Sequence, residues 1–178
     1  MDDNVRQELV ALLPRLRRFA YALSGSLEEA EDVVQSACEK ALTRLHQFEP
    51  GSRLDSWMFQ IVRTTWIDKV RYARRRETTS DPSTLENLHF DARIEQQTEA
   101  REHLAIIRDQ IAKLSEDQRT VIGLVTVDGM SYQNAAQTLG VPIGTIMSRL
   151  ARARRKLAEA IDPEWRAKDA PLAAKRGP

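Results

Sequence analysis

The sequence predicts an all-α protein built from two small helical domains joined by a flexible linker. Three observations support this fold class. Gly and Pro number only seven each among 178 residues, apolar residues recur at three- and four-residue steps in both halves, and a polar, turn-prone stretch separates the halves. We expect a first domain over residues 1–76, a linker over 77–97, a second domain over 98–162 and a flexible tail over 163–178.

The first domain should begin with a helix from Val5 to Leu23, whose apolar residues lie on one face. Pro14 interrupts this pattern and predicts a break or kink beside it, because proline removes a backbone donor. Ser26 followed by Glu29 is typical of a capping box. The helix that it starts should run from about Leu27 to His46, and its apolar face is expected to comprise Leu27, Ala30, Val34, Ala37, Cys38, Ala41 and Leu45.

A third helix is expected from Asp55 to Arg76, after the Pro50-Gly51 turn signal. It is rich in aromatic residues at first and in arginine later. Trp57 and Trp66 lie at helical spacing with other apolar residues, so core packing is the better interpretation of both. Cys38 is the only cysteine, which excludes an internal disulfide and favours a small core residue.

The second domain carries the strongest local pattern, a helix-turn-helix over residues 131–150. Ser115 with Gln118 predicts a second capping box and a helix that ends at Asp128-Gly129. Ser131 should cap a short helix that stops at Gly140, where the turn needs a left-handed backbone. A longer helix should follow from Pro142 to about Ile161.

The longer helix divides into two faces at 100° per residue. Its core stripe should comprise Ile146, Leu150, Ala153 and Leu157. The opposite face carries small residues and arginines, namely Gly144, Ser148, Ala151, Arg152 and Arg155, with Arg149, Arg154 and Lys156 on the flanks. Such a face can enter a major groove, where arginine pairs with guanine and flanking cations meet phosphates. The alternative is an ordinary helical hairpin with a solvated basic face.

The formal net charge of +1 gives no indication of nucleic-acid binding. The distribution of charge along the chain is more informative. Residues 63–76 hold six basic side chains and one acid, residues 142–156 hold five and none, and residues 77–109 hold eight acids and three arginines. Two basic segments around an acidic connector suggest two DNA contacts. The three histidines lack ligand-like spacing, so we expect no metal and no cofactor. No signal or membrane-spanning pattern occurs, and we expect a cytoplasmic protein.

Three stretches taken together resemble the extracytoplasmic-function (group 4) sigma factors of the bacterial sigma-70 family. They are residues 30–37, an acidic helix segment; residues 56–63 with 67–71, the aromatic and basic helix; and the helix-turn-helix with Leu114-Ser115 ahead of it. The resemblance implies sigma region 2 in the first domain and sigma region 4 in the second. Its partners would be core RNA polymerase, promoter DNA with −35 and −10 elements, and an anti-sigma factor.

The resemblance also implies site residues. Polymerase binding would fall to Glu31, Asp32 and Gln35. The −10 element would be read by Arg53, Trp57, Arg63, Thr64, Lys69 and Arg71. The −35 element would be read by Thr145, Met147, Ser148, Arg149, Ala151, Arg152, Arg155 and Lys156. Thr64 and Met147 depart from the family pattern, which commonly has Asn and Arg there, so the promoter sequence cannot be copied from a relative.

Two other classes of protein are alternatives to a sigma factor. A conventional helix-turn-helix repressor or activator would use its N-terminal half for ligand sensing or dimerisation, which the acidic helix and the aromatic-basic helix do not suggest. A nucleic-acid enzyme would need catalytic carboxylates, a phosphate-binding glycine loop or a nucleophile arrangement, and the sequence contains none of these patterns. We therefore expect no enzymatic activity.

Overall fold

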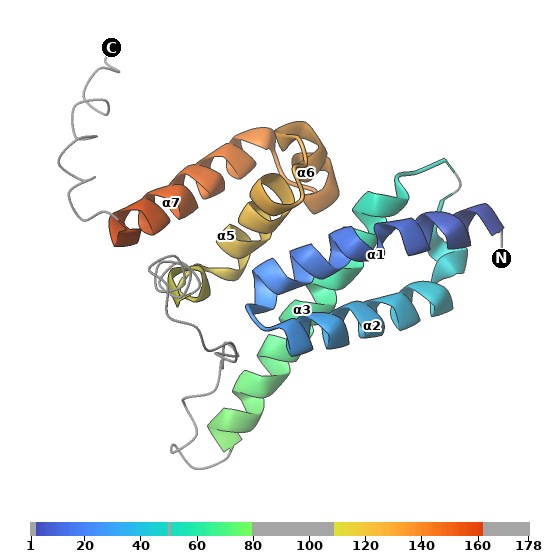
Figure 1. Cartoon of the computed structure of the whole chain (residues 1–178), viewed down its shortest axis with the longest axis horizontal. Coiled ribbons are helices and arrows are strands. Elements are labelled where there is room, and N and C mark those ends of the chain that lie inside the picture. The colour runs from blue at the N-terminus through green and yellow to red at the C-terminus, as the bar shows by residue number, and fades with distance from the viewer. Residues whose placement is uncertain (1–2, 50, 80–108, 162–178) are drawn as a thin grey trace, which may run out of the picture.

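The computed structural model describes residues 3–49, 51–79 and 109–161, and every regular element in these ranges is helical (Figure 1). In the N-terminal domain the elements are α1 (Asp3–Ser24), α2 (Leu27–Thr43), the 3-10 turn η1 (Leu45–Gln47) and α3 (Leu54–Thr79). In the C-terminal domain they are α5 (Glu116–Val121), the π-helical segment η3 (Ile122–Val127), α6 (Tyr132–Leu139) and α7 (Ile143–Ile161).

Helix α1 continues through Pro14, so a break beside this residue is wrong, and the alternative of a kink stays a prediction. Pro14 and Val10, the residue one turn earlier, are both exposed. A proline costs a helix the hydrogen bond to the carbonyl four residues before it, and on an exposed face that carbonyl can bond water instead. The opposite face is buried through Leu12, Leu16 and Phe19, which holds the helix in one piece.

Helix α2 begins as expected and ends earlier. The Ser26 hydroxyl accepts a hydrogen bond from the Glu29 backbone N–H at 3.3 Å, which confirms the helix start. The helix ends at Thr43, and His46 lies in the short 3-10 turn. Leu27 was expected on the buried face but is 71% exposed. This position is the first of the helix, where the chain enters from Ser26 and no element in the described part of the chain covers the side chain.

Cys38, Trp57 and Trp66 pack as the sequence indicates. Cys38 is half-buried against the hydrophobic core, and burial raises the pKa of its thiol. Trp66 is 2% exposed. Trp57 is half-buried, with its ring centroid 5.3 Å from that of Phe48. Helix α3 extends to Thr79, three residues into the segment that the sequence assigns to the linker. The remaining linker residues and the tail lie outside the described residues.

The C-terminal domain shows the expected caps. Ser115 and Gln118 form both halves of a capping box. Ser131 accepts a hydrogen bond from the Asn134 N–H at 3.1 Å, and Gly140 ends α6 in the left-handed region at φ 64°. One feature was not expected: the helix widens to π geometry at η3, where Asp128 N–H donates to the Gly123 carbonyl at 3.0 Å.

The two domains pack directly against each other. Helix α1 lies between α2 on one side and α5 with η3 on the other, and α6 packs against α3 (Figure 1). Buried apolar residues of both domains form one hydrophobic cluster. Gly123 of η3 lies against Phe19 of α1, since an added Cβ at this glycine would lie 2.8 Å from the Phe19 ring. The sequence left the placement of the domains open, and the structure describes a closed arrangement.

Candidate nucleic-acid interface and interdomain interface

The helix-turn-helix formed by α6 and α7 has the core that the sequence predicts. Ile146, Leu150 and Ala153 are at most 2% exposed, and Leu157 packs against the same cluster. Ala136, at the contact between the two helices, is also buried. The turn is closed by a hydrogen bond from the Val141 N–H to the Ala136 carbonyl at 3.1 Å. The two helices are therefore fixed relative to each other, which a DNA-reading helix requires.

The opposite face of α7 is open. Most of the residues that the sequence assigns to the −35 element are exposed there, namely Met147, Ser148, Ala151, Arg152, Arg155 and Lys156. Arg152 lies along the helix, with Nε donating to the Ser148 carbonyl at 3.2 Å and Nη2 to the Ser148 hydroxyl at 3.3 Å. These contacts orient the guanidinium group while leaving it accessible. The face can approach a groove closely because Ser148 and Ala151 are small.

Arg149 and Thr145 differ from the rest of that set, since both are half-buried. Arg149 Nη2 lies 2.6 Å from a carboxylate oxygen of Asp117 in α5. The side chain is thus held to its own domain at the edge of the reading helix. From this edge a cation is placed better for phosphate than for a base.

The residues that the sequence assigns to the −10 element do not share one face. Lys69 points to α2, with Nζ 3.4 Å from an Asp32 carboxylate oxygen. At 100° per residue it lies about 160° around α3 from Arg71. Arg53 pairs with Asp55 at 2.8 Å, and Thr64 is exposed with its hydroxyl bonded to carbonyls of its own helix.

Arg63 and Arg71 line a hollow of about 500 Å³ between α3 and α5. Its lining is basic on the α3 side and acidic at the start of α5, and comprises Arg63, Ile67, Arg71, Arg74, Leu114, Ser115, Glu116, Asp117 and Arg119. Arg63 Nη2 donates to Asp117 across the hollow at 3.1 Å, and Arg74 lies 3.6 Å from Glu116. Part of the basic face of α3 is therefore covered by the C-terminal domain.

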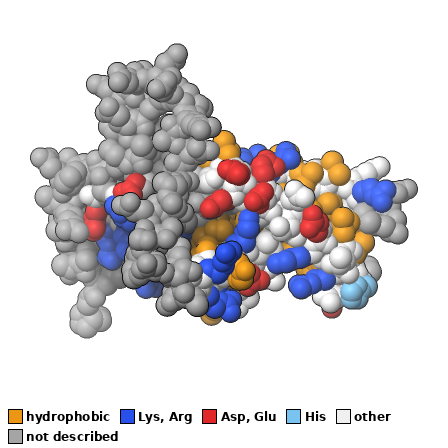
Figure 2. Space-filling model, turned by 90° about the horizontal axis from the view of Figure 1, so that it is seen from below, with side chains coloured by type: hydrophobic (Ala, Val, Ile, Leu, Met, Phe, Trp, Pro, Cys, Tyr) orange, Lys and Arg blue, Asp and Glu red, His pale blue; other side chains and the backbone are white. Residues whose placement is uncertain are grey.

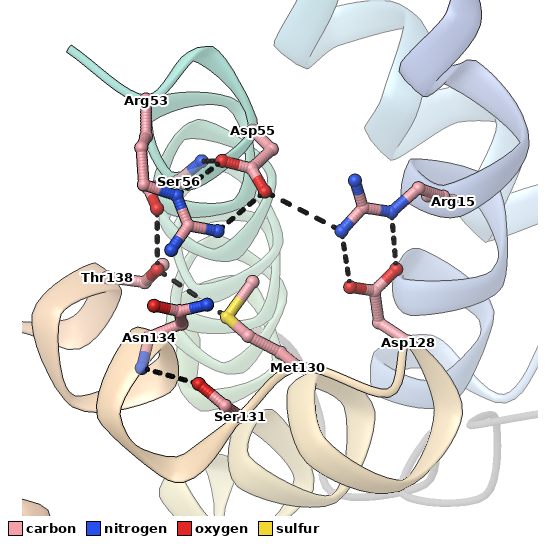
Figure 3. Close-up of polar contacts among 9 residues, drawn as sticks. All are labelled: Arg15, Arg53, Asp55, Ser56, Asp128, Met130, Ser131, Asn134 and Thr138. Carbon is pink, nitrogen blue, oxygen red and sulfur yellow. Dashed lines mark hydrogen bonds and ion pairs between the residues drawn. The ribbon is translucent and has the colours of Figure 1, made fainter.

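The interdomain interface contains a carboxylate whose side chain is fully buried, that of Asp128 (Figure 3). Arg15 of α1 donates two hydrogen bonds to it, at 2.9 and 2.7 Å. The same guanidinium group lies 3.6 Å from Asp55 and over the Phe59 ring. The hydrogen bond with Asp128 raises the pKa of Arg15. A bidentate pair of this kind fixes both distance and orientation between two elements.

A second group of contacts joins α3 to α6. The Thr138 hydroxyl donates to the Ser56 hydroxyl at 2.9 Å, and the Gln60 amide donates to the Thr138 carbonyl. Thr138 is 1% exposed, whereas Gln60 is exposed and Ser56 half-buried, so both contacts are partly buried. Ser56 and Gln60 flank Trp57 in sequence, which places the short helix of the helix-turn-helix against the segment assigned to the −10 element.

Arg119 is an interface residue that sequence reasoning missed. It is 5% exposed, its Nη1 donates to the Leu23 carbonyl at the end of α1 at 2.9 Å, and its guanidinium lies 4.9 Å from the centroid of the Trp66 ring. Burial lowers its pKa. A lone arginine in a predicted helix is usually on the surface, so no local signal distinguishes it.

The residues assigned to polymerase binding are all exposed on α2. Glu31 pairs with Arg17 at 3.1 Å, Asp32 with Lys69 at 3.4 Å, and Gln35 bonds Glu39 at 3.2 Å. Figure 2 shows one face of the molecule, on which acidic and basic side chains lie next to one another. The acidic face of α2 is thus accessible to a partner in the closed arrangement.

Two further findings concern membranes and metals. None of the helices in the described part of the chain is long and apolar enough to cross a membrane. Within the same residues no group of three or more His, Cys, Asp or Glu side chains is placed to hold a metal ion.

Comparison with known proteins identifies both domains. The model of Sigma-70 region 2 matches residues 9–76, and that of Sigma-70 region 4 matches residues 104–157. The ECF RNA polymerase sigma factor EcfG of Rhodopseudomonas palustris is 37% identical over 158 residues, which cover 89% of this chain and 85% of that protein. The RNA polymerase sigma factor CnrH of Cupriavidus metallidurans is 31% identical over 143 residues, which cover 76% of this chain and 75% of CnrH.

A solved structure has a similar fold along most of its length. The sigma factor RpoE of Bartonella quintana, crystallised with the anti-sigma factor NepR, matches with a TM-score of 0.73 and 36% identity. The match covers 89% of this chain and 96% of RpoE.

Proposed function

This chain belongs to the extracytoplasmic-function group of the sigma-70 family, and we propose that it binds core RNA polymerase and directs it to specific promoters. The observation that carries the proposal is the helix-turn-helix of α6 and α7, whose core stripe is buried and whose opposite, arginine-bearing face is exposed. That arrangement suits a helix lying in a major groove. The protein acts in the cytoplasm as an initiation factor, and catalysis of RNA synthesis belongs to the polymerase.

Each domain has its own part in this function. Exposed Glu31, Asp32 and Gln35 of α2 dock on the polymerase. The loop before α3 and the basic and aromatic residues of α3 capture the −10 element, because bases stack on aromatic rings and phosphates need cations. On α7, Arg152 reads a base of the −35 element, while Arg149 and Lys156 hold phosphates.

We further propose that an anti-sigma factor holds the protein inactive. The support is the similarity to Bartonella RpoE, which was solved in complex with the anti-sigma factor NepR and matches along 96% of its length. An inhibitor of this kind would have to cover the acidic face of α2 or the basic face of α7, because polymerase and DNA need those surfaces.

Run-off transcription with purified core polymerase tests the proposal. The full chain should start transcripts at specific sites only when core enzyme is present, and Asp32→Lys should weaken holoenzyme assembly by about tenfold, the effect of losing about 1.4 kcal/mol. The fold should survive, since an exposed pair such as Asp32–Lys69 contributes about 0–1 kcal/mol.

Glu8→Lys is a matched control, because Glu8 is an exposed acid on α1 that we do not assign to the polymerase surface. Equal losses in Asp32→Lys and Glu8→Lys would reduce the effect to net charge. Tight, site-specific DNA binding by the free chain, unchanged by core enzyme, would instead favour a conventional helix-turn-helix regulator.

A further inference from the structure

The hollow between α3 and α5 has no part of its own in the proposed function. Its volume of about 500 Å³ lies within the range of small-molecule pockets, about 300–1,000 Å³. Part of its lining is apolar, since Ile67 and Leu114 contribute to it and both are buried. The rest is rich in guanidinium groups, those of Arg63, Arg71, Arg74 and Arg119. A hollow with this lining suits a small anionic ligand.

We propose that the hollow binds a small anion with two linked phosphate groups, either inorganic pyrophosphate or the diphosphate end of a nucleotide. Guanidinium groups match phosphate oxygens, because their planar N–H donors form paired hydrogen bonds with them. The inference goes beyond the proposed function and does not depend on it, since the site is built from residues of the free chain alone.

Helix α3 brings three of the guanidinium groups to the same side of the hollow. Arg63, Ile67, Arg71 and Arg74 follow one another at steps of four, four and three residues, which places them within about 80° of one another on one helix face. From the first to the last the helix rises by about 16 Å. A single phosphate is too short to contact groups spread over this length. Two linked phosphates present oxygens to more than one guanidinium group.

The lining holds more positive charge than its own carboxylates neutralise. Four arginines line the hollow against two acids, Glu116 and Asp117. Glu116 lies 3.6 Å from Arg74. The two oxygens of Asp117 are divided between Arg63 and Arg149, at 3.1 and 2.6 Å. An excess of positive charge therefore remains, and a concave surface of one sign concentrates the field that attracts a ligand of the opposite sign.

Arg71 is the cation of the lining that is best placed to meet a ligand from solution. Its side chain is exposed, and no acid in the described part of the chain pairs with it. A ligand therefore gains this contact without having to displace a carboxylate. Arginine keeps its charge at any physiological pH, so the contact is available whenever the protein is folded.

Two further arginines show that the lining is short of hydrogen-bond acceptors. Arg119 is 5% exposed, and its Nη1 donates to the Leu23 carbonyl at 2.9 Å. Within the described residues, Nε of Arg119 and Nε of Arg63 are buried and have no acceptor. Unmade bonds of buried donors cost free energy. Negative charge in the hollow, beside both guanidinium groups, offsets part of that cost.

Isothermal titration calorimetry on the full-length chain, in buffer free of divalent cations, tests the site with inorganic pyrophosphate as the probe. Pyrophosphate should bind one to one and about tenfold more tightly than inorganic phosphate at equal ionic strength, because its second phosphate adds a charge-assisted contact. ADP distinguishes the two sources: tighter binding than pyrophosphate assigns the site to a nucleotide, and weaker binding assigns it to the free anion. Pyrophosphate binding no tighter than that of phosphate would overturn the proposal.

Two variants should change the affinity for pyrophosphate in opposite directions. Arg71→Ala removes a cation of the lining and should weaken binding about tenfold. Glu116→Gln removes a competing carboxylate and should strengthen binding about threefold. Arg76→Ala and Asp109→Asn are the matched controls, because they make the same charge changes at exposed positions outside the lining.

The controls decide whether binding is local to the hollow. Circular dichroism should show that all four variants keep the helical fold, since each replaced side chain lies at least partly in solvent. Both control variants should bind pyrophosphate as the unsubstituted chain does. Equal losses in Arg71→Ala and Arg76→Ala, or weaker binding in Glu116→Gln, would reduce the effect to net charge and overturn the site.

Discussion

Helices α3 and α7 both carry arginine-rich faces, yet the two faces have different surroundings. On α7, Arg152 and Arg155 are exposed. On α3, Arg63 is held by Asp117 of the other domain, and the neighbouring Gln60 donates to the Thr138 carbonyl. Arginine is thus presented to solvent at Arg152 and Arg155 of α7 and engaged in an interdomain contact at Arg63 of α3.

A basic helix face therefore identifies the polar side of a helix but not the partner of that side. Periodicity shows which side of a helix is polar, because core residues must lie on the other side. It does not show what covers the polar side. On α7 the polar side is open to a ligand from outside, whereas on α3 part of it has a ligand from the same chain, supplied by α5 and α6.

The largest expected effect is on the stability of the folded chain, and it compares a buried arginine with an exposed one. Arg119→Ala should destabilise the free chain by about 2–4 kcal/mol, because it removes a charged hydrogen bond to the Leu23 carbonyl and the stacking on Trp66. Arg152→Ala, on the exposed face of α7, should change stability by less than about 0.5 kcal/mol. Urea unfolding followed by circular dichroism measures both. Equal losses in the two variants would mean that burial of Arg119 does not stabilise the closed chain.

The next effect concerns DNA reading by α7. Arg152→Ala should relax preference at one or two adjacent positions of the −35 element, by about 1–3 kcal/mol for a lost bidentate guanine contact. Initiation on a promoter library randomised at that element measures this. A uniform loss across the library would reassign Arg152 to phosphate. No loss would mean that α7 presents a different face to the groove.

Much of the fold could be predicted because its signals are local. The caps at Ser26, Ser115 and Ser131 and the left-handed Gly140 depend on a few neighbouring residues, and the structure confirms all four. The core stripe of α7 follows from helical geometry alone and is also confirmed. Local chemistry of this kind is preserved wherever the domain happens to pack.

The parts that could not be predicted depend on contacts between distant residues. Arg15 and Asp128 are 113 residues apart, so nothing in either neighbourhood indicates the pair. The continuous path of α1 through Pro14 depends on buried residues of its opposite face, and the π geometry of η3 has no simple sequence signal. The sites assigned to DNA and polymerase stay predictions, since the geometry shows exposure and partners but not the ligands.

The smallest effect tests the part of α3 that the C-terminal domain does not hold. Thr64 is exposed, and within the described residues its hydroxyl donates to the Gln60 and Ile61 carbonyls of its own helix. Thr64→Ala should therefore change the stability of the free chain by less than about 0.5 kcal/mol and leave the closed arrangement intact. In holoenzyme it should still alter selection among promoters that differ at the −10 element, if Thr64 meets DNA. A shift in stability as large as that of Arg119→Ala would place Thr64 in the interdomain interface, and unchanged selection would remove it from the −10 site.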